Sequence, residues 1–140
     1  MKGPPNIGEY RKDYRKIHAD PELRKKWLVR EDYAKAVAES KIFIFGGSMF
    51  RYPLAKYMEG MMSGALVMAD LPFHAEELHF KPDWNMVEIN AENWKQKLEY
   101  YLDDPQLRMT IARRGYETAV KYHTNKVRAK EFIEMLESVK

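Results

Sequence analysis

A glycine-rich turn followed by a cation is the first stretch of the sequence whose residue types could do chemistry. Gly46, Gly47 and Ser48 come directly after a short apolar run over 42–45, and Arg51 follows three positions later. Glycine lets the backbone approach a ligand closely, and the free N–H groups at the start of a helix attract negatively charged groups. We therefore expect this turn to bind an anion.

Two strands and a helix must position the turn. The apolar run over 42–45 precedes it, a helical pattern extends over 53–63, and a second apolar run covers 65–69. This order predicts a βαβ unit with two parallel strands, and continuous apolar runs are typical of parallel strands covered on both faces. Open α/β sheets bind ligands beyond the carboxyl ends of their strands, so we expect a site at the edge that carries Asp70 and His74. His74 is either a phosphate ligand or acid at this edge, or a surface residue of a loop.

The helix over 53–63 has an apolar face and a polar face. The apolar stripe, at helical spacing, consists of Leu54, Tyr57, Met58, Met61 and Met62. Lys56 and Glu59 lie on the other side, where their spacing alone favours an exposed i,i+3 ion pair. Gly60 costs the helix about 1 kcal/mol relative to alanine, which indicates that something approaches the backbone closely at this position.

The segment 56–70, KYMEGMMSGALVMAD, resembles the donor-site segment of GT-B glycosyltransferases. In that family, a helix that carries a glutamate is followed by small residues, a glycine and an apolar strand. The chain is similar in particular to the C-terminal domain of the "glycosyl transferases group 1" type. The similarity continues through the segments 101–108, 111–115 and 122–124, and it covers roughly residues 33 to 135.

This resemblance implies a binding site for a nucleoside-diphosphate sugar, which is a substrate and not a cofactor. In such enzymes the helix glutamate hydrogen-bonds the ribose hydroxyls, a role that falls to Glu59, and the preceding turn offers its N–H groups to phosphate. Family members often carry another glutamate eight positions earlier, where this chain has Arg51, a cation suited to the diphosphate. No metal is expected, because cations and the helix terminus neutralise the diphosphate. The expected substrate-binding residues are Gly46, Gly47, Ser48, Arg51, Lys56 and Glu59; no catalytic residue is assigned.

Composition sets limits on the class of protein. The chain has 140 residues, of which 45% are hydrophobic and 32% charged, as is ordinary for a globular domain. It contains no cysteine, which excludes disulfides, zinc–thiolate sites and cysteine nucleophiles, and its four histidines lack metal-ligand spacing. No apolar run approaches the roughly 18 residues of a membrane span, and the first residues lack the apolar core of a signal peptide. These features favour a cytoplasmic protein.

Basic residues concentrate between positions 11 and 30, with Tyr10, Tyr14 and Trp27 among them. A basic stripe with aromatic side chains is what nucleic-acid binding needs. The net charge is only +3, however, and acidic residues dilute this region. Tyr10 and Tyr14 also lie at helical spacing, so we expect them to pack inward and do not expect nucleic acid as a partner.

The first forty residues are predicted to be helical. Asp20 and Pro21 are an N-cap and a first helical residue, and Asp32 is expected to cap a further helix that ends at Ser40. The side chains expected to face inward from the first of these helices are Leu23, Trp27 and Leu28.

The rest of the chain is predicted to complete the fold. A third strand is expected over 85–89, and Asn90, Asp104 and Thr124 are expected to cap three helices. Their apolar stripes are expected to cover the sheet; that of the last helix consists of Ala129, Phe132, Ile133 and Leu136. The predicted fold is a single α/β, Rossmann-like three-layer αβα domain over 1–140 with about three parallel strands. Within it, 1–40 is a helical N-terminal segment, 41–90 the βαβ core and 91–140 a set of C-terminal helices.

A short parallel sheet leaves an exposed edge, which proteins usually cover. The first strands of the family's domain have no counterpart before residue 33, so the edge is expected to be covered by the N-terminal helices, by a second copy in a homodimer or by a partner subunit. Two functions remain. The chain is the donor-binding domain of a glycosyltransferase, which needs a separate acceptor domain or partner and is an enzyme only as part of it. Alternatively, it is a non-catalytic Rossmann-like binding or assembly module derived from such an enzyme.

Overall fold

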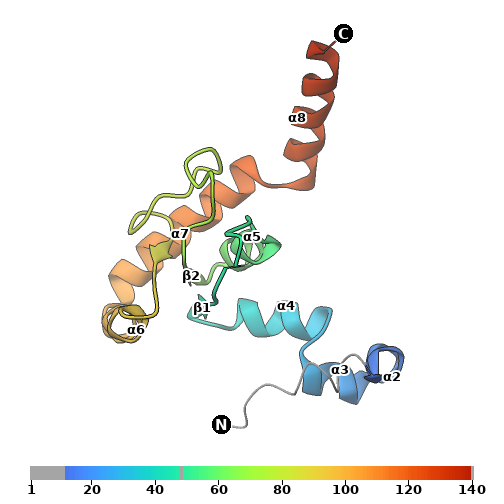
Figure 1. Ribbon diagram of the computed structural model, residues 1–140. Coiled ribbons are helices and arrows are strands. Elements are labelled where there is room, and N and C mark those ends of the chain that lie inside the picture. The colour runs from blue at the N-terminus through green and yellow to red at the C-terminus, as the bar shows by residue number, and fades with distance from the viewer. Residues whose placement is uncertain (1–11, 48, 140) are drawn as a thin grey trace. The chain divides into compact units, whose positions relative to one another are not determined.

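The computed structural model describes residues 12–47 and 49–139. They form two compact units, which divide between Glu39 and Ser40 (Figure 1). Tyr10 and Ser48, which the sequence singles out, lie outside the described residues. The single domain predicted over 1–140 stays a prediction.

The described part of unit 1 contains three short helices, α2 (Tyr14–Ala19), α3 (Pro21–Trp27) and α4 (Glu31–Ala38). The predicted cap of α3 is confirmed, because the Asp20 carboxylate accepts hydrogen bonds from the N–H groups of Glu22 and Leu23 at 2.9 and 3.2 Å. Three other predictions for this unit are wrong. Tyr14 does not pack inward, because its side chain is 52% exposed. Leu28 does not face inward: it ends α3 in the left-handed region with φ 50°, which turns its half-exposed side chain away. Asp32 does not cap α4, since the helix begins one residue earlier with Arg30 at the cap.

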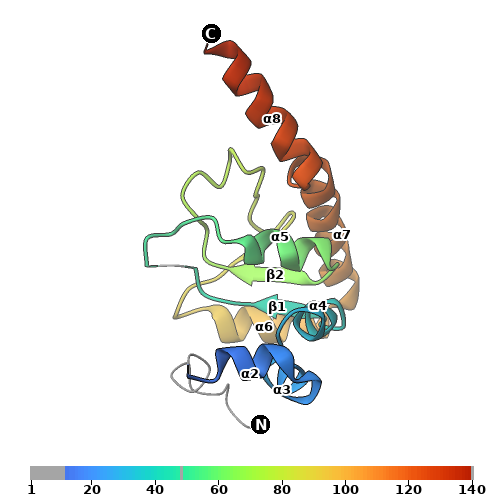
Figure 2. The same ribbon diagram turned by 90° about the vertical axis from the view of Figure 1, so that its right-hand side faces the viewer.

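Unit 2 is built on a sheet of three parallel strands, β1 (Ile42–Ile44), β2 (Leu66–Ala69) and β3 (Val87–Glu88), in the order β1-β2-β3. This confirms the predicted parallel sheet and its number of strands in the described residues. Figure 2 shows β1 and β2 side by side. All of β2 is buried because it is the central strand. At the edge of the sheet, Ile44 of β1 remains 38% exposed.

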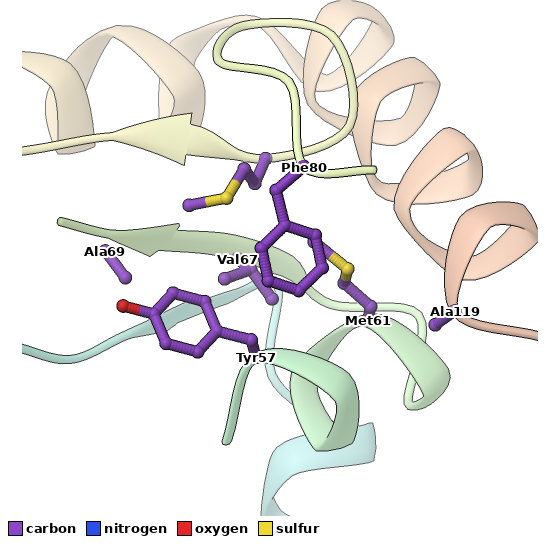
Figure 3. Close-up of a cluster of buried hydrophobic side chains, with 7 residues drawn as sticks. Tyr57, Met61, Val67, Ala69, Phe80 and Ala119 are labelled. Carbon is purple, nitrogen blue, oxygen red and sulfur yellow. The ribbon is translucent and has the colours of Figure 1, made fainter. Parts of the chain in front are cut away.

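Helices cover both faces of the sheet. Side chains alternate along a strand, so Val67 and Ala69 of β2 face α5 (Ala55–Met62), where they pack with Tyr57 and Met61 (Figure 3). The other face of the sheet packs against α6 (Trp94–Asp103) and α7 (Pro105–Tyr122). The residues of that second core are Leu66, Met68, Val87, Ile89, Tyr101, Ile111 and Ala112. The fold is therefore the predicted Rossmann-like αβα arrangement.

Two glycines let helices approach the rest of unit 2 closely. A Cβ atom at Gly60 would lie 2.6 Å from Cδ1 of Phe43 and 2.7 Å from Cγ2 of Val67. The group that approaches the backbone closely at Gly60 is therefore the sheet beneath α5. A Cβ atom at Gly115 of α7 would lie 2.7 Å from the carbonyl oxygen of Asn85.

Caps predicted for the C-terminal helices are confirmed at two of three positions. Asp104 accepts a hydrogen bond from Leu107 N–H at 2.9 Å, and Thr124 accepts one from Val127 N–H at 3.3 Å. Asn90, by contrast, does not cap α6. Its side-chain oxygen accepts hydrogen bonds from the N–H groups of Glu92 and Asn93, at 3.0 and 2.9 Å. These bonds form a turn, and the helix begins only after it, at Trp94.

The prediction that the last helix covers the sheet is wrong. Helix α8 (Asn125–Ser138) leaves the end of α7 and projects away from the sheet (Figures 1 and 2). Its apolar stripe is exposed, with exposed fractions of 57% for Phe132, 54% for Ile133 and 50% for Leu136. The periodicity of the stripe is correct, but no described residue of unit 2 buries it.

Candidate functional site

A pocket of about 380 Å³ lies across the carboxyl ends of all three strands. The strands run parallel, so the residues that follow them meet at one edge. The pocket is walled mainly by apolar groups, and Asp70 and Asn90 are its polar side chains. Its lining comprises Ile44, Phe45 and Gly46 beyond β1, Asp70 beyond β2, and Ile89, Asn90, Ala91 and Trp94 beyond β3.

Asp70 connects the ends of the first two strands. Its carboxylate accepts a hydrogen bond from Gly47 N–H, and its backbone carbonyl accepts one from the hydroxyl of Tyr57 at 2.6 Å. Burial, followed by the negative charge of Asp70, raises the pKa of Tyr57 to about 12. The hydroxyl therefore stays protonated at neutral pH and remains a donor to the Asp70 carbonyl. Asp70 thus fixes both the glycine turn and the end of β2.

Arg51 ties the glycine turn to the chain beyond β2. Its Nε and Nη2 atoms donate to the carbonyl of Leu71 at 3.0 and 2.7 Å, and its guanidinium lies 5.2 Å from the centroid of the Phe73 ring. The backbone returns the contact, since Phe73 N–H donates to the Arg51 carbonyl at 2.8 Å. Arg51 is not among the residues that line the pocket, and two of its donor atoms serve this contact.

The other residues predicted to bind substrate lie at different distances from the pocket. Gly46 lines it, and Gly47 is held next to it by Asp70. The Lys56 ammonium lies 5.8 Å from the ring centroid of Phe45, and Lys56 itself does not line the pocket. Glu59 is exposed on α5, one turn beyond Lys56. Ser48 is outside the described residues.

The sequence pattern missed two groups at this edge. Asn90 is predicted to be a helix cap, and Trp94 lies in the helix that this cap is expected to begin, yet both line the pocket. For Asn90, the signal that would have found it is its position just beyond the third strand; Trp94 lies further on, at the start of α6. His74 is exposed and does not line the pocket; its Nδ1 lies 2.9 Å from the Glu77 carboxylate.

Two further features of the described residues bear on the site. No group of three or more His, Asp or Glu side chains in this part of the chain is arranged to hold a metal ion. Among residues 12–47 and 49–139, no helix has the length and apolar character of a membrane span.

The chain was compared with known proteins. No curated protein matches it. The sequence profile of a family described as glycosyl transferase-like matches residues 3–134, which is nearly all of the 140-residue chain. A three-stranded parallel sheet with a pocket at its carboxyl edge is the kind of scaffold on which such a domain holds its ligand. The chain belongs to the glycosyl transferase-like family.

Proposed function

We propose that the chain is the donor-binding domain of a glycosyltransferase and binds a nucleoside-diphosphate sugar. One observation carries the proposal: in a chain of the glycosyl transferase-like family, a pocket of about 380 Å³ opens across the carboxyl ends of three parallel strands. This is where open α/β sheets bind ligands, and the volume lies within the range of small-molecule sites, about 300–1,000 Å³.

The charges around the pocket suit an anionic donor with hydroxyl groups. Lys56 supplies a cation next to the Phe45 ring, and among the described residues Nη1 of Arg51 has no hydrogen-bond partner. Both cations would offset the charge of the diphosphate, which grows as the bond from the anomeric carbon to the diphosphate oxygen breaks. The N–H of Gly47 is already bonded to Asp70. The other N–H groups of the turn would therefore donate to the phosphate. The N–H of Gly47 could do so only if the Asp70 side chain rotated away.

Glu59 is proposed to hold the ribose hydroxyls. A carboxylate accepts hydrogen bonds from hydroxyl groups, and such charge-assisted bonds contribute about 1.5–3 kcal/mol each. Glu59 is exposed on α5, the helix that also carries Lys56, so ribose and diphosphate would contact the same helix.

A non-catalytic assembly module is the second candidate. The observation that favours it is the exposed apolar stripe of α8, together with the position of β1 at the edge of the described sheet. Both are surfaces on which a second copy or a partner subunit would bury apolar area.

Calorimetric titration of the chain with UDP, GDP and ADP separates the two. Micromolar binding of one nucleotide, weakened at least about tenfold (about 1.4 kcal/mol) by Glu59→Ala, would support the donor-binding proposal. Glu137→Ala, which removes an exposed carboxylate from α8, is the matched control and should leave the affinity unchanged. Absence of binding to all three nucleotides would favour the assembly module.

A further inference from the structure

A second cavity, of about 260 Å³, shares no residue with the pocket at the carboxyl edge. Its walls come from the segment before β3 and from α7. We name it the Trp84 cavity after its central aromatic side chain. Its lining includes His79, Lys81, Trp84, Arg114, Lys121 and Tyr122.

Aromatic rings hold three cations at this cavity. The Lys81 ammonium lies 5.7 Å and the Arg114 guanidinium 5.2 Å from the centroid of Trp84, and the Lys121 ammonium lies 4.7 Å from that of Tyr122. These distances are within the range of cation–π contacts, about 6 Å. Tyr122 is itself fixed by stacking on His79, with ring centroids 3.7 Å apart. The cations are therefore gathered around one hollow.

Among the described residues that line the Trp84 cavity, three cations face a single carboxylate, that of Glu117. None of the three cations forms an ion pair with a carboxylate of the described residues. The Glu117 carboxylate lies 3.9 Å from Nε of Arg113, a residue that does not line the cavity. Like charges collected in a concave surface raise the local concentration of anions. An anion of matching size would relieve their mutual repulsion.

We propose that the Trp84 cavity binds a phosphoryl group, either as free phosphate or as the phosphomonoester of a small sugar. Arg114 offers a planar fork of N–H donors that suits phosphate oxygens, and Lys81 and Lys121 add point charges. The rings of Trp84 and Tyr122 would flank whatever the phosphoryl group carries. At 260 Å³ the cavity is smaller than most sites for drug-sized ligands, so a whole nucleotide sugar is not its ligand. The proposal does not depend on the donor pocket.

Tryptophan side chains provide a separate reporter for each site. The chain contains three tryptophans, of which Trp84 lines this cavity and Trp94 the pocket at the carboxyl edge. We would record the indole N–H resonances of the ¹⁵N-labelled chain, assign them with Trp84→Phe and Trp94→Phe, and titrate with inorganic phosphate at constant ionic strength. We expect a saturating shift of the Trp84 resonance and none of Trp94. A shift that grows linearly without saturating would overturn the proposal.

Charge variants test whether the cavity itself binds. Arg114→Gln and Lys121→Gln should each weaken phosphate binding at least about tenfold, or about 1.4 kcal/mol. Lys126→Gln removes the same charge from α8 and should leave it unchanged. Equal weakening by Lys126→Gln would mean that only net charge matters and would refute the site. Far-ultraviolet circular dichroism checks that each variant is folded.

The source of the phosphoryl group follows from a second titration. Glucose 6-phosphate binding more tightly than phosphate would support a phosphorylated sugar, and equal affinities would support the free ion. Glucose shifting Trp84 as strongly as glucose 6-phosphate would contradict a phosphoryl site. A nucleotide that shifts Trp94 reports on the donor pocket alone, so the two proposals fail separately.

Discussion

Tyr57 supports the functional edge through a single hydroxyl. The side chain is fully buried, and its hydroxyl donates to the carbonyl of Asp70 at 2.6 Å (Figure 3 shows its ring against Val67 and Phe80). Tyr57→Phe keeps the packing but leaves that carbonyl without its donor. We expect the free energy of unfolding to fall by about 1–2 kcal/mol, measured by urea denaturation. Tyr100→Phe, at a tyrosine that is 56% exposed, is the control and should be neutral; equal effects of the two would show that the hydroxyl bond contributes nothing.

His123 makes the stability of unit 2 depend on pH. Its Nδ1 lies 2.7 Å from Nη2 of Arg128 and its Nε2 lies 2.8 Å from the carbonyl of Leu78. Arginine only donates, so Nδ1 accepts and Nε2–H donates, which is the neutral imidazole. Burial, assisted by the charge of Arg128, lowers the pKa of His123 below its ordinary value of 6.5.

The unfolded chain therefore binds a proton at this histidine at a higher pH than the folded chain does. The contribution of His123 to stability is complete above pH 6.5 and is lost as the pH falls through the lower folded pKa. We expect the unfolding free energy to decrease on acidification from pH 7.5 to pH 5.5, about one unit to either side of the ordinary histidine pKa, and His123→Gln to flatten that decrease. Tyr100→Phe, which changes an exposed side chain and no histidine, should leave the slope as it is. An unchanged slope in His123→Gln would contradict the neutral assignment.

The sequence predicts the location of a site residue when that residue directly follows a strand. The glycine turn and Asp70 could be placed at the carboxyl edge from the sequence, because they follow apolar runs directly. The direction of the Arg51 side chain could not be predicted from the sequence. It depends on a left-handed backbone at Arg51, with φ 52°, and on the carbonyl of Leu71, twenty residues away in the chain. Whether Glu59 contacts ribose stays a prediction.

The contact of α7 with the segment before β3 tolerates no side chain at Gly115. A Cβ atom there would lie 2.7 Å from a backbone oxygen, that of Asn85. Asn85 itself is fixed, because its side chain bonds to Lys81 N–H at 2.8 Å, to the His79 carbonyl at 2.8 Å and to the Thr118 hydroxyl at 3.0 Å. The clash therefore cannot be relieved by rotating a side chain.

We expect Gly115→Ala to lower the free energy of unfolding by about 1–3 kcal/mol, the usual effect of overpacking. Alanine favours a helix by about 1 kcal/mol over glycine, so a stabilised variant would mean that α7 can shift away from Asn85. Gly46→Ala is the control, since a Cβ atom at Gly46 has no neighbour within 4 Å. Thermal and urea denaturation of both variants provide the comparison.

Elements were predictable from periodicity and caps, but their partners were not. Apolar runs identified all three described strands, and Asp104 and Thr124 fixed the starts of α7 and α8. The stripe of α8 obeys the same 3.6-residue period as that of α7, and periodicity does not say what lies against a stripe. Only the direction in which the chain turns at His123 separates the covered helix from the exposed one.

At the level of the whole chain, the exposed stripe of α8 makes a prediction about assembly. Phe132 and Ile133 are 57% and 54% exposed, so Phe132→Ser and Ile133→Ser should each change the free energy of unfolding by no more than about 0.5 kcal/mol if the chain is a monomer. Ile111→Ala, in the covered stripe of α7, should cost about 2–5 kcal/mol. Urea denaturation at two protein concentrations measures all three.

A loss above about 2 kcal/mol for the α8 variants would mean that the stripe is covered in solution. If the stability of the wild-type chain also rises with protein concentration, a second copy covers it, which would favour the assembly module over a donor-binding domain that acts alone.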